Sequence, residues 1–544
     1  MWHCDEESEK ELMSAPKPHE EIFADWLHFD PLVVRRAVTA SAPSLADNTA
    51  DLDRLRRALR QQGYDPLRVP PGELGAYANR FRQGNFKATA VLSFTGDGWE
   101  LTELFSGTDQ SPVFGVAVDL GTTQIAFYLV DLITGQLLDR LSVPNPQISY
   151  GEDILTRIIY ASTPNRLLLL QDLLRSTLNE TLSFLADKHG FRVSQIYALT
   201  VAGNTTMTHF FLGLDPSRLC KEPYIPVANT FPILHGTDLR VAMHPRGLVV
   251  VFPNVGSYFG GDVIAGILAT GMHRTEEICL LVDVGTNAEV VLGNKDWLVA
   301  CAGAAGPALE GGVVERGMMA QPGAIDRVRI DPDSLELTYH VLGDEKPKGL
   351  CGSGLIDLVA EMFMAGLLTI QGKINTQIID PRIVVSENGP AYVVAWADET
   401  ADGRDLLVSE IDIGILLKSK AAMYTILNII TRKVGLRVQD IHRFFVAGTF
   451  GSHIDPVMAI RIGMLPDLPL KTFQGMGNTA GRGAAMTLLD RRLLGDMNDV
   501  RQRITYVELN VNLELMNEFR GATFLPHTDP KLFPSVTIHP RAMG

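Results

Sequence analysis

The sequence predicts an α/β protein with two related lobes, preceded by a small α/β domain. Three observations lead to this prediction. An apolar strand ends in Asp-Leu-Gly-Thr-Thr from Asp119, and a second apolar strand ends in Asp-Val-Gly-Thr-Asn from Asp283. A third strand ends in Ala-Gly-Thr-Phe-Gly from Ala447. Because the first two strand-turn-strand units lie 164 residues apart, at residues 119 and 283, they indicate a duplicated fold with one unit at the start of each half.

The composition is that of a folded protein without a nucleic-acid surface. With 544 residues, 46% of them hydrophobic and 20% charged, the chain has enough apolar side chains for several domain cores. The net charge of −15 argues against non-specific nucleic-acid binding, which needs a basic surface. The apolar stretch 414–430 is interrupted by Lys418 and Lys420, so we expect a helix packed against a core and no membrane span.

The cysteines do not form a ligand pattern. There are five, an odd number, at wide spacings: Cys4, Cys220, Cys279, Cys301 and Cys351. This usage does not fit a disulfide framework, and the acidic first residues do not fit a signal peptide, so we expect a cytoplasmic protein. Because a cluster needs about four closely placed cysteines, we expect no iron–sulfur cluster in this chain.

The domains are expected in the following order. Residues 1–29 are polar and are predicted to be a leader or linker, and residues 30–110 to be the small α/β domain, with a helix over 51–62 and strands over 88–94 and 99–105. The first lobe is predicted over 111–275 and the second over 276–544, with an inserted β-meander near 380–413 and a helix over 415–436.

The two Asp-x-Gly-Thr turns have the chemistry of phosphate-binding loops. Gly121 lets the backbone turn and approach an anion, and Thr122 and Thr123 offer N–H and hydroxyl groups to phosphate oxygens. A carboxylate repels phosphate, so the expected role of Asp119 is to hold Mg²⁺ or its water shell. The second loop repeats the pattern. The predicted residues of the two loops are Asp119 and Asp283 as catalytic and metal-binding carboxylates, with Gly121, Thr122, Thr123, Gln124, Gly285, Thr286 and Asn287 around the phosphates.

Two facing hairpins of this kind are typical of the actin/Hsp70/sugar-kinase-like (ASKHA, ribonuclease H-like) fold, in which they bind the phosphates of ATP. The third glycine segment is expected to bind adenosine, because small residues at the end of a strand let a purine and ribose lie against the backbone. Its predicted residues are Gly448, Thr449, Phe450 and Gly451. Gly477 and Asn478 either line the same pocket or begin the next helix.

Two further glycine-rich segments have alternative interpretations. The segment 301–312, with Gly303 and Gly306, either surrounds the phosphates with backbone amides or allows close helix packing. The segment 348–354 precedes an apolar helix, and Gly352, Ser353 and Gly354 are candidates for binding an anion at the helix start. Cys301 and Cys351 are expected to be packing residues within these segments.

Three other residues are candidates on weaker grounds. Asp262 opens an apolar helix and is either its cap or a catalytic carboxylate that orients the attacking water. His209 and His453 rank lower, because a lone histidine is more often structural than catalytic. The polar, turn-rich segment 145–153 is compatible with the mouth of a cleft.

Several motifs, in order and at matching spacing, give the chain a family resemblance. AVDLGTTQIAFYLVDL, NPQISYGEDILTRI, VAGNTTMTHFFLGLDP, LVDVGTNAEVVL, KPKGLCGSGLIDL, FVAGTFGSHIDP and FLPHTDPKLFPSV resemble segments of the ATP-dependent reductive activators of corrinoid-dependent enzymes. The resemblance covers residues 113–536, and residues 30–110 resemble that family's small middle domain.

The resemblance implies a specific activity. Such activators use ATP binding and hydrolysis to drive the reduction of an inactive Co(II) corrinoid to Co(I), and they tend to be homodimers that serve corrinoid methyl carriers. They usually carry an N-terminal [2Fe–2S] ferredoxin domain with four cysteines, whereas only Cys4 lies before the predicted small domain here. The implied partners are therefore a corrinoid protein and a separate ferredoxin-like electron donor, with ATP and Mg²⁺ as cofactors.

Two other functions remain open from the residues alone. A small-molecule kinase of the sugar or carboxylate kinase class would use the same ATP loops with Asp262 as base, although no sugar-binding signature is present. A non-catalytic ATP-dependent regulatory protein would need only nucleotide binding.

Overall fold

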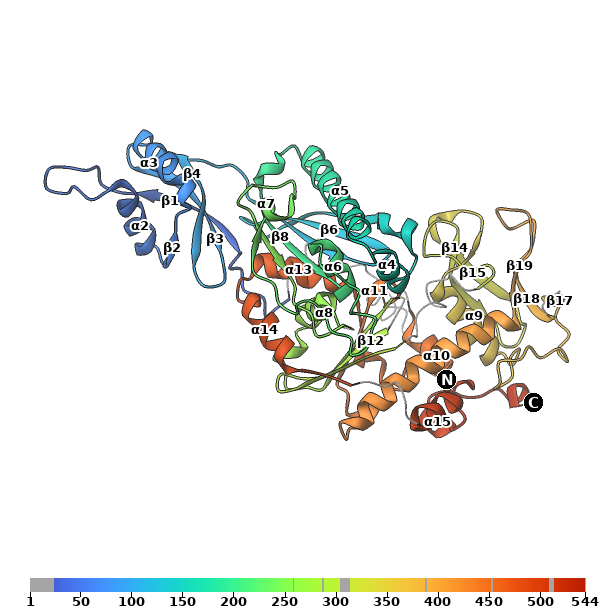
Figure 1. Cartoon of the computed structure of the whole chain (residues 1–544). Helices are drawn as coiled ribbons and strands as arrows, with labels where there is room; N and C mark the ends of the chain where they lie inside the picture. The colour runs from blue at the N-terminus through green and yellow to red at the C-terminus, as the bar shows by residue number, and fades with distance from the viewer. Residues whose placement is uncertain are drawn as a thin grey trace. The chain divides into compact units, whose positions relative to one another are not determined.

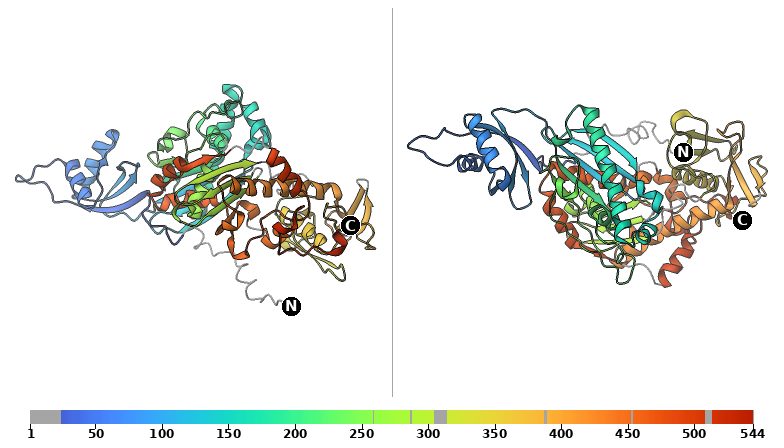
Figure 2. Two further views of the ribbon diagram at one scale, coloured as in Figure 1. Left: turned by 90° about the horizontal axis from the view of Figure 1, so that it is seen from below. Right: turned by 45° about the horizontal axis from the view of Figure 1, so that its top comes forward.

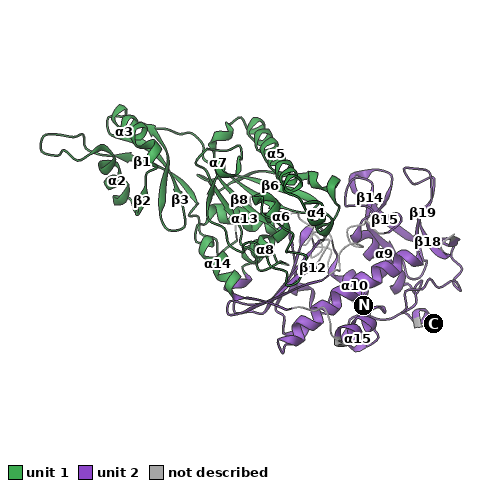
Figure 3. Cartoon of the chain, viewed as in Figure 1, with its two compact units in different colours: residues 1–271, 479–502 green, residues 272–478, 503–544 purple. Residues whose placement is uncertain are grey.

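The computed structural model describes residues 24–257, 259–285, 288–303, 314–386, 389–451, 454–507 and 513–543 (Figure 1). The chain forms two compact units. Unit 1 consists of Met1–Gly271 and Thr479–Gln502, and unit 2 of Met272–Asn478 and Arg503–Gly544 (Figure 3).

Unit 1 begins with the small α/β domain. Its sheet has the order β1-β3-β4-β2 and carries α2 and α3. Alternate side chains of β3, such as Ala90 and Leu92, pack in one apolar core with Leu55 of α2 and Phe81 of α3. The predicted helix and two strands are confirmed within a residue or two. The elements are β1 (Val33–Thr39), α2 (Asp51–Gln61), β2 (Leu67–Arg68), α3 (Leu74–Gln83), β3 (Lys87–Phe94) and β4 (Trp99–Ser106).

The rest of unit 1 is built on a six-stranded mixed sheet with the order β7-β6-β5-β8-β10-β9. The central strands β5 and β8 are parallel and apolar on both faces because helices cover both (Figures 1 and 2). Val116 and Val118 of β5 face the leucines of α5, whereas Thr200 of β8 donates its hydroxyl to Ala484 O of α13 at 2.9 Å. The elements are β5 (Phe114–Leu120), β6 (Gln124–Asp131), β7 (Leu137–Pro144), α4 (Ile154–Tyr160), α5 (Pro164–His189), β8 (Ile196–Gly203), α6 (Thr205–Leu212), β9 (Leu234–His235), α7 (Gly236–Leu239), β10 (Leu248–Val251) and α8 (Gly261–Thr270).

One late segment returns to unit 1, which differs from the expectation that residues 276–544 form a single lobe. Helix α13 (Thr479–Leu489) and most of α14 (Leu493–Arg503) belong to unit 1. Two glycines let α13 lie close to its neighbours: a Cβ on Gly483 would lie 2.0 Å from Ala265 O in α8, and one on Gly481 would lie 2.1 Å from the ring of Tyr128 in β6. Because α13 packs this closely on α8 and β6, it is part of unit 1.

Unit 2 repeats the sheet plan of unit 1, which confirms the duplicated fold. The order is β21-β20-β11-β12-β13-β22, in which β11 pairs antiparallel with β12 and parallel with β20, just as β5 pairs with β6 and β8. The elements are β11 (Cys279–Val284), β12 (Ala288–Gly293), β13 (Leu298–Gly303), β20 (Arg443–Ala447), α11 (Gly448–Gly451), α12 (Pro456–Arg461), β21 (Phe473–Gly477), β22 (Ile504–Tyr506) and α15 (Leu513–Ala522).

The remainder of unit 2 contains two three-stranded sheets and two long helices. The predicted β-meander is confirmed as β17-β18-β19. Helix α10, predicted over 415–436, begins earlier because Ser409 and Asp412 form a capping box, with Asp412 Oδ2 accepting from Ser409 N at 2.9 Å. The elements are β14 (Ala324–Ile330), β15 (Leu337–Val341), β16 (Gly349–Leu350), α9 (Gly352–Met364), β17 (Ile383–Ser386), β18 (Gly389–Ala395), β19 (Leu406–Ser409) and α10 (Glu410–Lys433).

Helix α10 is the single helix of the described chain that is long and apolar enough to cross a membrane. Two thirds of its most apolar window is buried inside the protein, where it packs on β12, β13 and α15. Lys420, in the middle of the helix, is fully buried, and its Nζ donates to Phe524 O and to Pro526 O, the latter at 2.7 Å. The helix therefore has the environment of a core helix, as the two lysines in its sequence predict.

Candidate functional site

The first phosphate loop lies where β5 turns into β6. Asp119 is the penultimate residue of β5 and pairs with Ala126 of β6 and Ala202 of β8, so its carboxylate is at the carboxyl end of two parallel strands. A Cβ on Gly121 would lie 2.4 Å from Gln124 O, so the turn requires glycine at this position. The backbone is thus drawn into the tight hairpin that the Asp-Leu-Gly-Thr-Thr motif predicts.

Two asparagines hold this loop by hydrogen bonds. Asn145 donates its side-chain amide to Gly121 O at 2.9 Å and its backbone N–H to Thr123 O at 2.9 Å. Asn204 donates its side-chain amide to Thr122 Oγ1 at 3.0 Å. All three hydrogen bonds are made within unit 1, so the loop is organised by the protein itself.

Each asparagine also begins a helix. Asn145 accepts from Gln147 N at 3.0 Å at the start of a short 3₁₀ turn, and Asn204 accepts from Met207 N at 2.9 Å at the start of α6. Neither asparagine was predicted to bind the nucleotide, and Asn145 was named only within the segment 145–153 at the mouth of a cleft. The available signal was an asparagine directly after a strand and directly before a helix, which by itself indicates only a cap.

Asp262 lies near the same edge of the sheet. It is the second residue of α8, whose N-cap is Gly260, so the structure does not support its interpretation as the helix cap. A Cβ on Gly260 would lie 2.3 Å from Asn204 Cα, so the start of α8 is packed against the loop-holding asparagine. Asp262 is half-buried and accepts from Val263 N at 2.8 Å, and its removal from water raises its pKa to about 6. A carboxyl group with this pKa changes its charge near neutral pH.

The second phosphate loop is packed against the third glycine segment. Asp283 of β11 pairs with Glu289 of β12 and Ala447 of β20, the same position that Asp119 has in unit 1. Gly448 follows β20 with a φ of +85°, and a Cβ there would lie 3.0 Å from Asp283 Oδ1. Unit 2 therefore brings the two predicted segments into contact. Gly285 is described, whereas Thr286 and Asn287 lie outside the described residues.

The predicted adenosine segments also lie side by side. Residues 448–451, expected as a glycine loop, form the helical turn α11, in which the backbone of Thr449 and Phe450 is described. A Cβ on Gly475 would lie 2.9 Å from Gly451 O, and Gly477 pairs with Ala447 at the end of β21. Asn478 follows as the last residue of unit 2 before α13. Glycine backbones at the ends of two neighbouring strands are thus packed against each other.

The other glycine candidates are explained by packing. A Cβ on Gly303 would lie 2.2 Å from the Ile426 side chain of α10, and one on Gly354 would lie 2.2 Å from Ile325 O of β14. Gly352 and Ser353 are buried with Gly354 in the first turn of α9. These contacts favour the close-packing interpretation, and a phosphate role for these residues remains a prediction. Gly306 lies outside the described residues.

The remaining candidates are structural where they are described. Cys301 and Cys351 are buried, and burial raises the pKa of Cys301 to about 12. His209 is fully buried: its Nδ1 lies 2.7 Å from Thr205 O, and its Nε2 accepts from Val227 N at 3.1 Å. A carbonyl on one side and an N–H on the other require the neutral ring, and burial lowers its pKa accordingly. His453 lies outside the described residues.

The carboxylates fit Mg²⁺ held together with a nucleotide. Within the described ranges no group of three or more His, Cys, Asp and Glu residues is placed to hold a metal by itself. Mg²⁺ is usually bound through one or two carboxylates together with substrate phosphates and water, rather than in a cage of protein ligands. Single carboxylates such as Asp119 and Asp283, each beside a glycine turn, are the donor set that this mode requires.

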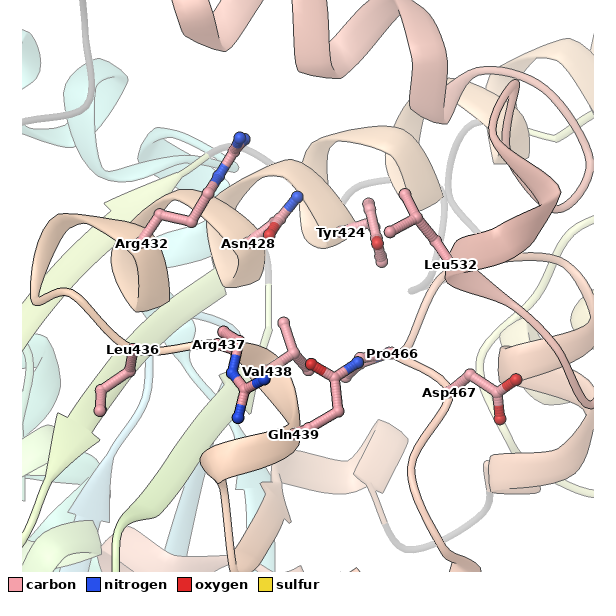
Figure 4. A pocket seen from close by; sticks show the side chains of 10 residues that line it. All are labelled: Tyr424, Asn428, Arg432, Leu436, Arg437, Val438, Gln439, Pro466, Asp467 and Leu532. Carbon is pink, nitrogen blue, oxygen red and sulfur yellow. The ribbon is translucent and has the colours of Figure 1, made fainter.

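A cavity of about 180 Å³ lies elsewhere in unit 2 (Figure 4). Tyr424, Asn428 and Arg432 of α10 line one side of it, and none of the predicted nucleotide residues contributes. Arg432 is paired with Glu518 at 2.7 Å, and a second lining residue, Arg437, with Asp440 at 3.2 Å. The charges of these two arginines are already paired within the protein, so neither of them needs a ligand in the cavity.

Comparison with known families covers most of the chain. Residues 25–111 match the RACo linker region, residues 114–275 the RACo middle region, and residues 277–537 the C-terminal domain of RACo, the ASKHA domain. The first segment was expected to correspond to the family's middle domain; that assignment is wrong, because the middle region is the first lobe.

Individual relatives agree with these matches. The chain is 33% identical over 494 residues to the corrinoid activation enzyme RamQ of Eubacterium limosum. The aligned region covers 89% of this chain and 81% of that relative. It is 24% identical over 425 residues to the [Co(II) methylated amine-specific corrinoid protein] reductase of Methanosarcina barkeri, covering 72% and 73% of the two chains. A solved structure titled reductive activator for corrinoid,iron-sulfur protein superposes with a TM-score of 0.86 at 39% identity, covering 94% of this chain and 82% of the other.

Proposed function

The chain belongs to the RACo family of reductive activators, and from this premise we propose that it couples ATP binding and hydrolysis to the reduction of a corrinoid protein from Co(II) to Co(I). The observation that supports this most directly is the duplicated sheet. Asp119 and Asp283 occupy the same place in the two halves, each one residue before the end of the central strand and before a glycine turn.

In the proposed mechanism each of the two loops binds phosphate groups of ATP. Asp119 and Asp283 hold Mg²⁺ or its water shell, which neutralises phosphate charge when it is bound. The N–H and hydroxyl groups of residues 121–124 and 285–287 contact the phosphates, and the backbone of residues 448–451 and 477–478 contacts the adenosine. Asp262, with its pKa near neutral, orients the attacking water in its ionised form.

The partners are proposed from the relatives' names and from the cysteines of this chain. Two relatives are named for acting on corrinoid proteins, so we propose a corrinoid protein of a methyltransferase system as the partner. The four described cysteines are buried or half-buried, and no three potential ligands gather among the described residues. We therefore propose that a ferredoxin-like donor outside these residues supplies the electron. A cytoplasmic homodimer is the proposed working form.

Energy coupling requires that ATP distinguish two states of the protein. A ligand shifts a conformational equilibrium only by the difference between its affinities for the two conformations. The proposed sequence is that ATP favours a conformation that binds the Co(II) corrinoid protein, one electron passes from the donor to cobalt to give Co(I), and hydrolysis returns the activator to its resting state.

The test is an anaerobic assay in which corrinoid absorbance follows the loss of Co(II) and the appearance of Co(I). Purified chain, Mg-ATP, a low-potential reductant and a candidate corrinoid protein are expected to give Co(I), and omission of ATP is expected to prevent it. Asp283→Ala is expected to abolish both Mg-ATP turnover and Co(I) formation. ATP hydrolysis that no corrinoid protein changes, together with phosphorylation of a sugar or carboxylate, would instead establish the kinase alternative.

A further inference from the structure

A buried arginine to which no carboxylate of the described chain is hydrogen-bonded lies beside the residues that hold the first phosphate loop. Arg157 of α4 is completely buried. Its Nε donates to Gly151 O at 2.7 Å, and its Nη1 lies 3.6 Å from Met207 Sδ. Its Nη2 is also buried and has no hydrogen-bond partner among the residues that the structure describes. One nitrogen of a charged guanidinium is thus left without an acceptor.

The charge of Asp153 favours the charged form of Arg157, but among the described residues no carboxylate accepts a hydrogen bond from the guanidinium. Asp153, four residues earlier on the chain, uses its carboxylate to cap α4, accepting from Thr156 N at 2.9 Å and from Thr156 Oγ1 at 2.7 Å. Burial lowers the pKa of Arg157 to about 10, so the side chain stays charged at neutral pH. A buried charge without a partner disfavours the folded protein, and an anion brought near it relieves that cost.

The contacts of Arg157 lead directly to the phosphate loop. Met207 Sδ, which the guanidinium contacts, lies 3.8 Å from Asn145 Nδ2, and the backbone N–H of Met207 donates to Asn204 Oδ1 at 2.9 Å. These are the two asparagines that hold the loop. Gly151, the other contact of Arg157, ends the short segment that begins at Asn145. Arg157 therefore supports both loop-holding asparagines from the interior of unit 1.

We propose that Arg157 is a positioning residue for ATP, which favours negatively charged phosphates at the first loop and fixes the segment 145–151 that holds the loop. The proposal rests on the proposed function, because it takes the loop to be the phosphate site. The group that satisfies the charge is then the polyphosphate, whose field acts through the loop rather than by direct contact with the buried side chain. Attraction of this kind increases with the charge of the ligand.

The test compares ligands of different charge. Binding of ATP, ADP and adenosine, each with Mg²⁺, is measured by calorimetry for the wild-type chain and for Arg157→Met, which has similar length and no charge. The expected loss is largest for ATP, about tenfold or more, smaller for ADP and absent for adenosine. Arg157→Lys, which keeps the charge, is expected to restore most of the ATP affinity.

Controls separate this role from a structural one. Arg54 in the small domain is also a buried arginine, but it is paired with Asp47. Arg54→Met is expected to lower stability and leave all three affinities unchanged. If Arg157→Met does not fold, Arg157→Gln, which keeps a donor toward Gly151 without the charge, serves for the same comparison. An equal loss for all three ligands, or no loss, in a folded neutral variant overturns the proposal. A wild-type chain that binds no ATP overturns the proposed function itself.

Discussion

Gly448 and Asp283 are in contact: a Cβ atom added to Gly448 would lie 3.0 Å from Asp283 Oδ1 and 2.6 Å from Val284 O. The residues are 165 positions apart in the sequence, at 283 and 448, and they meet because β11 and β20 are parallel neighbours. The first residue of the adenosine segment, Gly448, therefore limits where the carboxylate of Asp283 in the second phosphate loop can lie.

Gly448→Ala is expected to weaken Mg-ATP binding by at least about tenfold, because the methyl group displaces the carboxylate and the φ of +85° strains any other residue by about 1 kcal/mol or more. Calorimetric titration with Mg-ATP measures the loss. The matched control is Gly435→Ala, since Gly435 has a similar φ of +75° and no atom within 4 Å of its added Cβ. Equal ATP affinities in the two variants would show that the contact with Asp283 has no role in binding.

Asn204 offers a way to separate helix capping from loop support. Asn204→Ala loses both the acceptor for Met207 N and the donor to Thr122 Oγ1, so we expect a loss of about 1 kcal/mol in stability and weaker ATP binding. Asn204→Asp keeps the cap and places a negative charge beside the loop. It is expected to unfold at the wild-type temperature and to bind ATP about tenfold more weakly. Wild-type ATP affinity in Asn204→Asp would contradict the placement of phosphate at this loop.

Asp262 predicts a specific pH dependence of turnover. Its pKa is raised to about 6 by burial, and only the ionised carboxylate can accept a hydrogen bond from the attacking water. ATP hydrolysis at saturating ATP is expected to fall about tenfold per pH unit below 6 and to be level above about 7. Asp262→Asn is expected to hydrolyse ATP slowly at every pH while ATP affinity stays within a few-fold. A pH profile of Asp262→Asn with the same acid limb would exclude this carboxylate.

The same pKa fixes the sign of a stability effect. The folded protein holds the proton of Asp262 more tightly than the unfolded chain does, so this group makes the protein less stable as the pH rises from about 4 to about 6. Converted to free energy, the pKa shift corresponds to a loss of at most about 3 kcal/mol in stability. The actual loss is expected to be smaller, because solvent reaches the side chain of Asp262. Asp262→Asn is therefore expected to be more stable than wild type at pH 8 and equally stable at pH 4, as urea unfolding would show.

Lys420 predicts how the C-terminal segment responds to pH. Burial lowers its pKa, so the unfolded chain binds more protons and the contribution of Lys420 to stability rises with pH toward its unfolded pKa. Its amine donates to Phe524 O and Pro526 O, and between them the Leu525 N–H donates to Ile370 O at 2.8 Å. Hydrogen exchange at Leu525 is expected to be faster in Lys420→Met, with a larger difference at pH 9 than at pH 6.

The control for this prediction is Lys418→Met, because Lys418 lies on the same helix and is exposed. It is expected to leave the exchange at Leu525 unchanged at both pH values. A pH-independent difference between wild type and Lys420→Met would show that only the two hydrogen bonds, and not the titration of the buried amine, stabilise the segment.

The local features of this protein could be predicted from its sequence because their determinants are adjacent in the chain. The turns after Asp119 and Asp283 follow from a buried strand, a glycine and two polar residues, and both β-hairpins were predicted. The contact between Gly448 and Asp283 could not be predicted from the sequence, because it depends on the pairing of β11 with β20. The return of α13 to unit 1 depends on Gly483 meeting Ala265. Arg157 carries no sequence signal, because its buried Nη2, without a hydrogen-bond partner among the described residues, is apparent only in three dimensions.

The late return of α13 has a consequence for biosynthesis. The face of β5 and β8 that receives Ala484 and its neighbours stays uncovered until residues 479–489 have left the ribosome. By then all of unit 2 except its last strand and C-terminal segment has been made. Unit 1 therefore cannot be completed as a nascent N-terminal domain, and the sheet that carries its phosphate loop is fully packed only after residues 479–489 have been made. A ribosome-bound chain that ends before residue 479 is expected to be a client of chaperones.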